Sequence, residues 1–467
     1  MKAKIPFSIK VIAGTLLITA CNISPEKPNI ILINIDDMGW RDVGFMGSEY
    51  YETPNLDKLA EEGMVFNNAY ASASNCAPSR ACLISGQWTP RHGIYTVGSS
   101  IRGESKDRKL IPIPTNTTLP ENQYTLAKAL GNAEYKTCHA GKWHLSNDPK
   151  GNGFDYNIGG SHAGQPGSYY PPYKNIDLEP PSDDYYLTNL IMDKTIEFLN
   201  MADNTPFFLY YSPYAVHAPI QPKIDLMPKY ENKPGWNGQD NARYATMIEN
   251  LDTQIGRLIE CLKKNGELNN TFILFTSDNG GVYNITRQWP LRSGKGSYYE
   301  GGFRVPMFAW WPSRIKAGTK SEIPVTNLDF FPTFLEIAGL ELPDGKSLDG
   351  QSLLPVLTGT GSLKERPLFW HFPFYLQPYM KEGDPTQDPL FRTRPGSAVR
   401  LGDWKLIQYF EFNDLELYNL KDDISEKNNL AETRPDKLNE LLLILENWRK
   451  ETGAPVPVEL NPEYTGH

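Results

Sequence analysis

One run of apolar residues, Pro28 to Ile35, most constrains the fold of this chain. It is nearly continuous and rich in β-branched residues, which is typical of a central parallel strand that is covered on both faces. Further strands are expected at residues 135–139, 206–211, 272–276 and 305–310, with helical patterns between them. This alternation predicts an α/β fold, in which a large wound sheet, mixed or parallel, is flanked by helices.

Three helices are marked clearly. The first begins at Thr53-Pro54-Asn55 and ends at Glu62 before Gly63, because proline suits a first helical turn and glycine follows a last one. The second spans residues 241–264, with apolar residues at three- and four-residue spacing and no chemistry assigned to it. The third spans residues 328–338, where Pro332 starts or kinks the helix.

The pattern changes after about Leu363. Residues 398–407 read as a hairpin around Gly402-Asp403, residues 415–418 as another alternating strand, and residues 438–448 as a last amphipathic helix. We therefore expect a main α/β domain at 29–363 and a smaller C-terminal subdomain of antiparallel sheet plus helix at 364–467.

The N-terminus resembles an export signal. Two lysines precede an apolar run from Val11 to Ala20, and Cys21 follows it; the run is too short to span a bilayer. The string Ile18-Thr19-Ala20-Cys21 resembles a bacterial lipobox, which predicts a lipoprotein-type signal peptide at 1–21, a lipid anchor on Cys21 and a tether at 22–28. Ordinary signal cleavage nearby is the alternative. We expect an exported protein, periplasmic or at the cell surface, that contacts the membrane only through this anchor.

Composition favours a globular enzyme. The chain has 467 residues, of which 22% are charged and 40% hydrophobic, and this excludes a disordered or fibrous protein. The net charge of −9 argues against a nucleic-acid partner, and an anionic substrate would need local cations and a metal to bind. Cys82, Cys138 and Cys261 match no zinc pattern, and one disulfide or three buried thiols both remain open.

The stretch from Asn75 to Gly86 is the strongest candidate for a site. Pro78 suits the first turn of a helix and Gly86 its end, which places Cys76 just outside the helix N-terminus. Free N–H groups and the helix dipole favour negative charge there, and Arg80 adds a guanidinium one turn along. The stretch therefore joins a nucleophile to an oxyanion site, although a free cysteine is also often a small buried apolar residue.

Two of the expected strands end in oxygen-bearing side chains. Asp36-Asp37 follows the first strand and Asp278-Asn279 follows the strand at 272–276. Parallel strands deliver such residues to one edge of a sheet, and hard oxygen ligands without His or Cys suit Ca²⁺, with Mg²⁺ as the alternative. An Asp pair at a strand end can instead cap a helix.

Three further segments carry candidate catalytic residues. Lys142 and His144, in Gly141-Lys142-Trp143-His144, can point into one cleft from an extended segment. His217 lies in a loop directly after a strand, a position that suits a general acid. Lys295 lies between two glycines that allow close backbone approach. A solvated lysine and a structural histidine are the alternative for Lys142 and His144, and a loop histidine such as His217 is by itself only a candidate.

The string Cys76-Ala77-Pro78-Ser79-Arg80, followed by Leu83 and Ser85-Gly86, resembles the signature of the type I, formylglycine-dependent sulfatases of the alkaline-phosphatase-like superfamily. The resemblance implies that a formylglycine-generating enzyme oxidises Cys76 to an aldehyde, whose hydrate attacks sulfur. It also implies one divalent cation, held by Asp36, Asp37, Asp278, Asn279 and the modified Cys76.

The same resemblance implies the remaining roles. Lys142 and His144 orient and activate the formylglycine, His217 protonates the leaving alcohol, and Lys295 binds the sulfate and the bridging oxygen, while Arg80 helps to neutralise the sulfate. Ser146 stands where the family commonly has glycine.

For the substrate we expect sulfated extracellular carbohydrate, because export and a chain rich in Trp and Tyr suggest foraging on polymers. Trp370 and His371, and the loop from Tyr169 to Tyr173, are candidate walls of a sugar site, and a core position is the alternative for His371. Three other functions remain open: a formylglycine-dependent phosphodiesterase or phosphonate hydrolase, a non-catalytic glycan-binding lipoprotein, and a cysteine hydrolase that uses Cys76 as thiolate beside His144.

Overall fold

The computed structural model describes residues 27–466 apart from 202, 204, 343 and 380–384, together with residues 1 and 3. Most of the predicted signal peptide and tether, including Cys21, lies outside the described residues. Among the helices that the structure describes, none combines the length and the apolar character that a membrane crossing requires.

The central feature is a mixed sheet of eight strands in the order β5-β4-β6-β1-β7-β8-β2-β9. As predicted, β1 is a central strand, parallel to β6 on one side and to β7 on the other, and fully buried. The strand expected at 305–310 is shorter and runs antiparallel to β7, so the sheet is mixed. The strands are β1 (Asn29–Ile35), β2 (Met64–Phe66), β4 (Lys136–Gly141), β5 (Tyr156–Ile158), β6 (Phe207–Ser212), β7 (Thr271–Ser277), β8 (Phe308–Trp310) and β9 (Thr319–Ser321).

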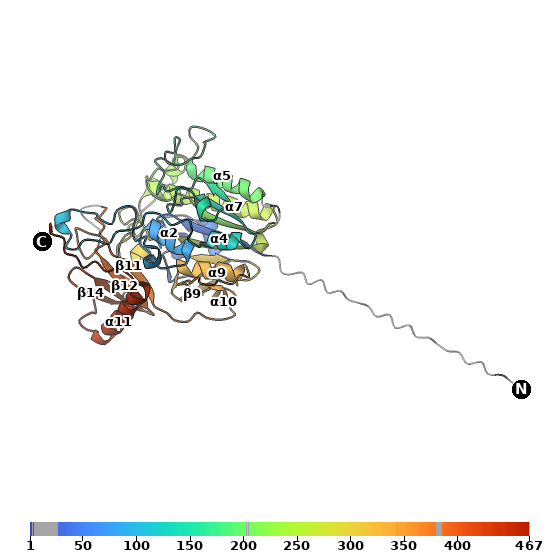
Figure 1. Ribbon diagram of the computed structural model, residues 1–467. Helices are drawn as coiled ribbons and strands as arrows, with labels where there is room; N and C mark the ends of the chain where they lie inside the picture. Colours follow the sequence, from blue (N-terminus) through green and yellow to red (C-terminus); the bar gives the residue numbers. More distant parts are fainter. Residues whose placement is uncertain are drawn as a thin grey trace.

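Helices cover both faces of this sheet (Figure 1). One layer contains α1 (Pro54–Glu61), α5 (Leu187–Asn200) and α7 (Ala242–Lys264), and the other contains α2 (Cys76–Ser85), α4 (Leu126–Gly131) and α9 (Phe330–Ile337). Side chains alternate along β1, so Ile31 and Ile33 pack in the first layer with Leu251 of α7, while Leu32 packs in the second with Leu83 of α2. The α/β expectation is confirmed.

Local interactions explain where two of the predicted helices begin. The Asn241 side chain accepts a hydrogen bond from the Tyr244 backbone N–H at 3.2 Å and so caps α7. Helix α9 begins at Phe330, which places Pro332 in the first turn, where its missing N–H is no loss. Helix α5 and the short strands β2, β5 and β9 were not individually predicted.

Short elements connect these layers. They are α3 (Thr89–His92), α6 (Met227–Tyr230), α8 (Glu300–Phe303), α10 (Leu354–Leu357), the strand pair β3 (Ala69–Tyr70) and β10 (Val325–Thr326), and 3₁₀ turns at Gly44–Met46, Ser105–Asp107, Pro149–Asn152, Ile224–Leu226, Leu268–Asn270 and Asn327–Asp329.

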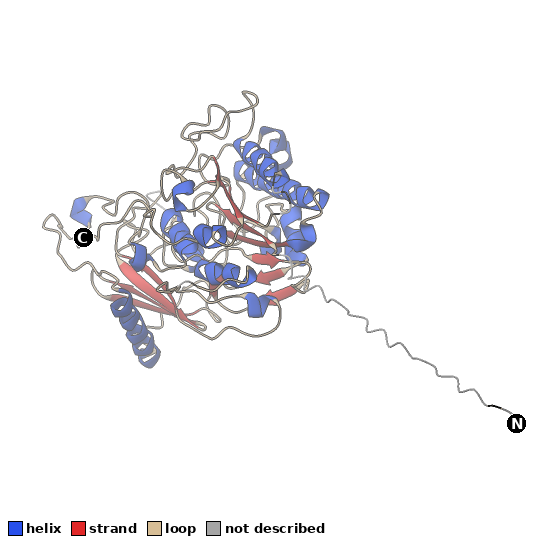
Figure 2. Ribbon diagram, turned by 45° about the vertical axis from the view of Figure 1, so that its right-hand side comes forward, coloured by secondary structure: helices blue, strands red, loops and turns tan. Residues whose placement is uncertain are grey.

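A second, antiparallel sheet lies beside the first in both ribbon views (Figures 1 and 2). It contains β11 (Leu368–Phe372), β12 (Gly396–Leu401), β13 (Trp404–Tyr409) and β14 (Asp414–Asn419), paired in that order. The predicted hairpin is confirmed: Leu401 pairs with Trp404, and Gly402 supplies a φ of 58° at the turn. Helix α11 (Pro435–Thr452) packs on this sheet. The exact division at 363/364 stays a prediction.

The cysteines that the structure describes, Cys76, Cys82, Cys138 and Cys261, are all buried and free of disulfides. Of the two readings left open for Cys82, Cys138 and Cys261, the structure therefore has buried thiols.

We expect Leu441→Ala to destabilise the C-terminal subdomain by about 2–5 kcal/mol, because Leu441 of α11 is fully buried against the second sheet and its loss leaves a cavity. Leu443, two residues away on the same helix, is 59% exposed, so Leu443→Ala is the matched control and should change stability by less than about 0.5 kcal/mol. Urea unfolding followed by circular dichroism measures both. Equal effects of the two changes would contradict the packing of α11.

Candidate active site

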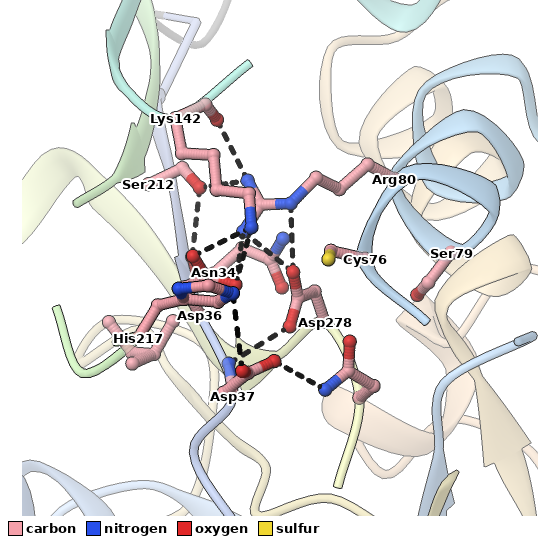
Figure 3. Close-up of polar contacts among 12 residues, drawn as sticks. Asn34, Asp36, Asp37, Cys76, Ser79, Arg80, Lys142, Ser212, His217 and Asp278 are labelled. Carbon is pink, nitrogen blue, oxygen red and sulfur yellow. Dashed lines mark hydrogen bonds and ion pairs between the residues drawn. The ribbon is translucent and has the colours of Figure 1, made fainter. Parts of the chain in front are cut away.

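The carboxyl ends of four parallel strands, β4, β6, β1 and β7, lie side by side at one edge of the main sheet. The polar residues at these ends are Lys142 after β4, Ser212 at the end of β6, Asp36 and Asp37 after β1, and Asp278 and Asn279 after β7. Figure 3 shows that Cys76 and Arg80 approach this group from α2. The sheet thus brings together the candidate residues of segments that lie far apart in the sequence.

Arg80 connects three of these strand ends. Its Nε and Nη2 lie 2.8 and 2.7 Å from the same carboxylate oxygen of Asp278. Its Nη1 donates to the backbone oxygen of Lys142 at 2.8 Å and to the hydroxyl of Ser212. Arg80 is 1% exposed, so its guanidinium is a fixed, buried charge.

Lys142 pairs with Asp36. Its Nζ donates to both carboxylate oxygens of Asp36 at 2.8 Å, and both side chains are fully buried. Burial favours the neutral amine, but Asp36 outweighs it and raises the pKa of Lys142. Burial raises the pKa of Asp36 to about 6, even though Lys142 and Arg80 act in the opposite direction. The ammonium group of Lys142 is therefore held charged inside the protein.

Lys295 lies between Asp37 and Cys76. Its Nζ donates to Asp37 and lies 3.5 Å from Cys76 Sγ. Burial would raise the pKa of Asp37, but Lys295 and the nearby His217 and Lys142 hold it below its usual range. Burial would likewise raise the pKa of the Cys76 thiol, and Lys142 and Lys295 lower it. Residue 76 thus lies in a positive environment that favours an anion.

Helix α2 begins at Cys76 itself, with Asn75 as the N-cap, rather than one or two residues later as expected. Pro78 still lies within the first turn. The side chain of Asn327 donates to the hydroxyl and the backbone oxygen of Ser79, at 2.9 and 3.1 Å, and fixes this turn against the segment before α9. Cys76 is therefore positioned by the helix and by a buried polar anchor.

His217 faces the carboxylates from the loop after β6. Its Nδ1 lies 2.8 Å from the Ala218 oxygen, which makes Nδ1 the protonated donor, and its Nε2 lies 3.5 Å from Asp37 Oδ2. The hydroxyl of Tyr169 donates to the backbone oxygens of Tyr214 and His217 and supports this loop. Burial lowers the pKa of His217, with Lys142 and Lys295 adding to it and Asp37 opposing it.

His144 follows β4 with a φ of 65° and is buried. Among the described residues, its Nδ1 has no hydrogen-bond partner. Burial first, and then Lys142 and Arg80, lower the pKa of His144 well below its usual value. A neutral imidazole beside these cations is available as a proton acceptor.

The residues at this edge fit a hard divalent cation. Ligand atoms of Asp36, Asp37, Cys76 and His217 lie within 4.8 Å of one another, and Asp278 accepts from the Asp37 backbone N–H at 3.2 Å. The Asn279 amide oxygen is buried without a hydrogen-bond partner among the described residues. A buried, unsatisfied oxygen beside three carboxylates is the donor set that Ca²⁺ and Mg²⁺ prefer.

A cavity of about 260 Å³ opens beside Asp37 and His217. Apolar side chains dominate its walls, and Gln165, Asn284 and Tyr379 add polar groups; the remaining lining residues are Val216, Ala218, Ile220, Tyr244, Val282 and Ile285. An apolar surface with a few polar groups, next to a charged cluster, suits an organic group attached to an anion.

Two substrate-binding expectations are wrong. Trp370 and His371 belong to the core, each 1% exposed: the indole stacks on Phe303 at 4.2 Å, and the imidazole bonds to Ser397 and the Pro455 oxygen. Burial lowers the pKa of His371 to about 3. Tyr169 is buried behind His217, and Gln165 lines the cavity. A wall formed by the rest of the loop up to Tyr173 stays a prediction.

Ser212 and Asn327 are the positioning residues that sequence reasoning missed. Ser212 accepts from Arg80 and donates to the Asn34 oxygen at 3.0 Å. Ser212 directly follows a predicted strand, and this location could have identified it as a candidate site residue. No such local signal identified Asn327, because it reaches Ser79 across 248 residues of sequence.

Comparisons with known proteins agree on one family. Residues 28–340 match the family described as Sulfatase, and residues 294–447 match the family described as N-sulphoglucosamine sulphohydrolase, C-terminal. The human N-acetylgalactosamine-6-sulfatase is 32% identical, over 74% of this chain and 69% of that protein. A sulfatase of Formosa agariphila is also 32% identical, over 93% of this chain and 90% of that protein.

A solved structure shares the fold over nearly the whole length. The crystal structure of Ps i-CgsB in complex with k-i-k-neocarrahexaose has a TM-score of 0.75 and 31% identity, covering 93% of this chain and 95% of that chain.

We expect Ca²⁺ or Mg²⁺ to raise the melting temperature of the protein, because a cation that binds the folded carboxylates and not the unfolded chain stabilises by mass action. Thermal unfolding in chelator and in increasing cation measures the shift. Asp37→Asn should remove most of it, whereas Asp225→Asn, which changes a side chain that is 66% exposed, is the control and should keep it. A shift that survives Asp37→Asn would place the cation elsewhere.

Proposed function

The chain belongs to the sulfatase family, and we propose that it hydrolyses the sulfate esters of extracellular glycans through a formylglycine made from Cys76. The observation that carries this proposal is the environment of residue 76. Cys76 Sγ lies 3.5 Å from Lys295 Nζ, at the start of a helix and beside a cluster of three carboxylates and three buried cations. Such a site suits a nucleophile that attacks an anionic ester.

The glycan substrate is supported by two facts of different kinds. The apolar cavity of about 260 Å³ next to His217 has the size and lining for a sugar ring beside the sulfate. Ps i-CgsB, which shares the fold at 31% identity, has been solved with a carrageenan-type hexaose, k-i-k-neocarrahexaose. Together they favour a carbohydrate over a simple aryl sulfate as the natural substrate.

Residue 76 supplies the nucleophile. As a hydrated aldehyde it offers one hydroxyl that attacks sulfur and a second whose deprotonation later expels sulfate. The thiol of Cys76 marks where these oxygens would lie. Lys295 and Lys142 hold the sulfate oxygens and the hydrate, and Arg80 maintains the positive field from behind. Because these cations are fixed before the substrate arrives, little reorganisation is needed as charge develops.

His217 and His144 move protons. The Nδ1–H of His217 is committed to the Ala218 oxygen, so Nε2 is the atom that delivers a proton to the departing sugar oxygen. A bound sulfate would favour the imidazolium, since an opposite charge nearby stabilises the charged form. His144, neutral and beside Lys142, accepts the proton of the second hydroxyl when sulfate leaves.

We propose Ca²⁺ as the cation, with Mg²⁺ as the alternative. Asp36, Asp37, Asp278, Asn279 and the modified residue 76 would hold it. When bound, the cation polarises the sulfate oxygens and adds positive charge to the site.

Maturation and location follow from the motif and the N-terminus. The string Cys76-Ala77-Pro78-Ser79-Arg80 is the part that a formylglycine-generating enzyme would recognise. We propose export to the periplasm or the cell surface, with Cys21 as the lipid-anchored residue.

We expect the matured protein to release sulfate from sulfated mono- and disaccharides of galactose, N-acetylgalactosamine, glucosamine or uronic acid types. Activity should rise in proportion to the formylglycine fraction at residue 76, measured by peptide mass spectrometry, since the aldehyde is the nucleophile. Cys76→Ala should reduce kcat by at least about 10³-fold, because only the binding contributions remain.

The same preparations should be tested with an aryl phosphate diester. Turnover of the diester above that of all sulfate esters would assign the protein to phosphodiester hydrolysis. Full activity in a sample whose residue 76 is entirely unmodified thiol would falsify the formylglycine proposal.

We expect His217→Ala to reduce kcat/KM for alkyl and sugar sulfates by about 10²–10⁴-fold, because a poor leaving group needs a proton from the enzyme. The loss for an aryl sulfate such as nitrophenyl sulfate should be at least tenfold smaller, since a phenolate departs without one. The ratio of the two losses is an internal control for misfolding. Equal losses would make His217 a binding residue.

A further inference from the structure

Arg392 is a buried cation, and the described part of the chain offers no hydrogen-bond acceptor to its Nε or Nη1. It lies in the segment between 384 and β12 and is 8% exposed. A buried guanidinium with unsatisfied N–H groups is costly, since each unsatisfied charged donor loses its hydration. Such a group indicates a ligand.

The guanidinium of Arg392 packs on the ring of Tyr379 and close to Gly296. Its Cζ lies 3.5 Å from the centroid of the Tyr379 ring. On the Gly296 side, a Cβ added to the glycine would lie 2.6 Å from Arg392 Nε. Gly296 has a φ of 88° and can therefore be replaced by few residues other than glycine. Stacking on Tyr379 occupies one face of the guanidinium and leaves its N–H edge for hydrogen bonding.

A second guanidinium lies near the first. Arg102 is held by backbone oxygens, with its Nε donating to Ser99 O at 3.2 Å and its Nη2 to Val97 O. The next residue, Gly103, packs against Phe391, since an added Cβ there would lie 2.6 Å from the Phe391 ring. Burial and then the charge of Arg392 lower the pKa of Arg102. Two like charges brought together favour an anion between them.

Arg392 is joined to the catalytic residues through Gly296. The Thr393 hydroxyl donates to the Gly296 oxygen, and the Gly296 N–H donates to the Ser74 oxygen at 2.9 Å. Gly296 follows Lys295, and Ser74 precedes Cys76 by two residues. Tyr379, which stacks on Arg392, also lines the cavity beside His217 and Asp37. The two arginines therefore lie at the border of the active site.

We propose that Arg392 and Arg102 form a second anion site, which binds a second negatively charged group of the substrate, a carboxylate or a further sulfate, while the ester to be cleaved lies at residue 76. The site would select a glycan with two or more anionic groups. This inference rests on the proposed function and deepens it by naming the charge pattern of the substrate.

The chemistry of the site supports this selection. Guanidinium groups match the planar carboxylate and the oxygen triangle of sulfate better than an ammonium does. The net charge of −9 repels a polyanion at long range, so a second local cation site is needed to offset that repulsion. A neutral sugar would leave the buried N–H groups of Arg392 unpaired and would bind less tightly.

The test uses three derivatives of the sulfated disaccharide that the wild-type enzyme desulfates fastest. The neighbouring sugar is neutral, carries a second sulfate, or is oxidised to a uronate. Wild-type enzyme should show a lower KM for at least one doubly anionic derivative. Arg392→Gln should raise that KM by about 10–100-fold, the value of a charged hydrogen bond, and should change the KM of the neutral derivative at least tenfold less. If the KM of the doubly sulfated derivative rises, the second group is a sulfate. If the KM of the uronate derivative rises, it is a carboxylate.

Three further variants make the test specific. Arg392→Lys keeps the positive charge and should therefore retain part of the preference for the doubly anionic derivative. If Arg392 had only a structural role, this preference would not depend on the charge at position 392. Arg314→Gln removes the same charge from an exposed side chain, so it controls for a general change in electrostatic attraction. Melting temperatures identify any variant that fails to fold, and Arg102→Gln then provides an independent measurement at the second guanidinium.

A binding measurement separates this proposal from the proposed function. The Cys76→Ala protein is titrated calorimetrically with the three derivatives, with and without Arg392→Gln, and requires no turnover. The site is supported if a doubly anionic derivative binds more tightly than the neutral one and if Arg392→Gln abolishes this difference. This result does not depend on catalysis. Equal affinity for the neutral and anionic derivatives, or equal weakening of all three by Arg392→Gln, would overturn it while leaving the sulfatase assignment intact.

Discussion

The structure depends on a balance of buried charge at the carboxyl edge of the main sheet. Asp36, Asp37 and Asp278 lie against Lys142, Lys295 and Arg80. Removing charges from water costs several kcal/mol for each ion, and mutual pairing repays this only when the geometry is accurate. The geometry comes from the sheet, because parallel strands in register place their ends together, and from α2, whose first turn is fixed by Asn327. The pairing that offsets this desolvation cost is thus the same arrangement that holds cations in place for a sulfate ester.

The second sheet supports this edge instead of forming the sugar wall that the sequence suggested. Lys405 of β13 is fully buried between Glu300, at 3.1 Å, and Glu426, at 2.6 Å. Glu426 also accepts from the backbone N–H of Glu300 at 2.7 Å. Burial raises the pKa of Glu426, with Lys405 opposing it and the neighbouring Glu300 carboxylate adding to it, whereas Lys405 and the nearby arginines, against burial, lower the pKa of Glu300. Because Glu300 begins the short helix after Lys295, this network ties the C-terminal sheet to the turn that carries Lys295.

Local patterns explain how far the sequence could predict this protein. Three elements depend on patterns of neighbouring residues, and the structure confirms all three: the apolar run before Asp36, the helix at 241–264 and the hairpin at Gly402. The string around Cys76 indicated the family for the same reason. Ser212 and Asn327 were missed because their partners lie 132 and 248 residues away. Trp370 and His371 were misplaced because an aromatic cluster looks alike in a core and in a sugar site; only the stacking on Phe303 and the bonds to Ser397 and Pro455 distinguish the two.

The contrast between overall and local charge has a physical consequence for substrate choice. A net charge of −9 repels a sulfated polymer that approaches to within about a Debye length of the surface, roughly 8 Å in physiological salt. Non-specific adsorption to the polymer is therefore weak, and attraction arises only where buried cations contact the ligand. Salt screens the repulsion more than it screens these desolvated contacts. With Lys142, Lys295 and Arg80 at the ester and the proposed anion site at Arg392, the protein would gain its affinity from a few positions. It would then recognise the spacing of charges on a glycan more than their number.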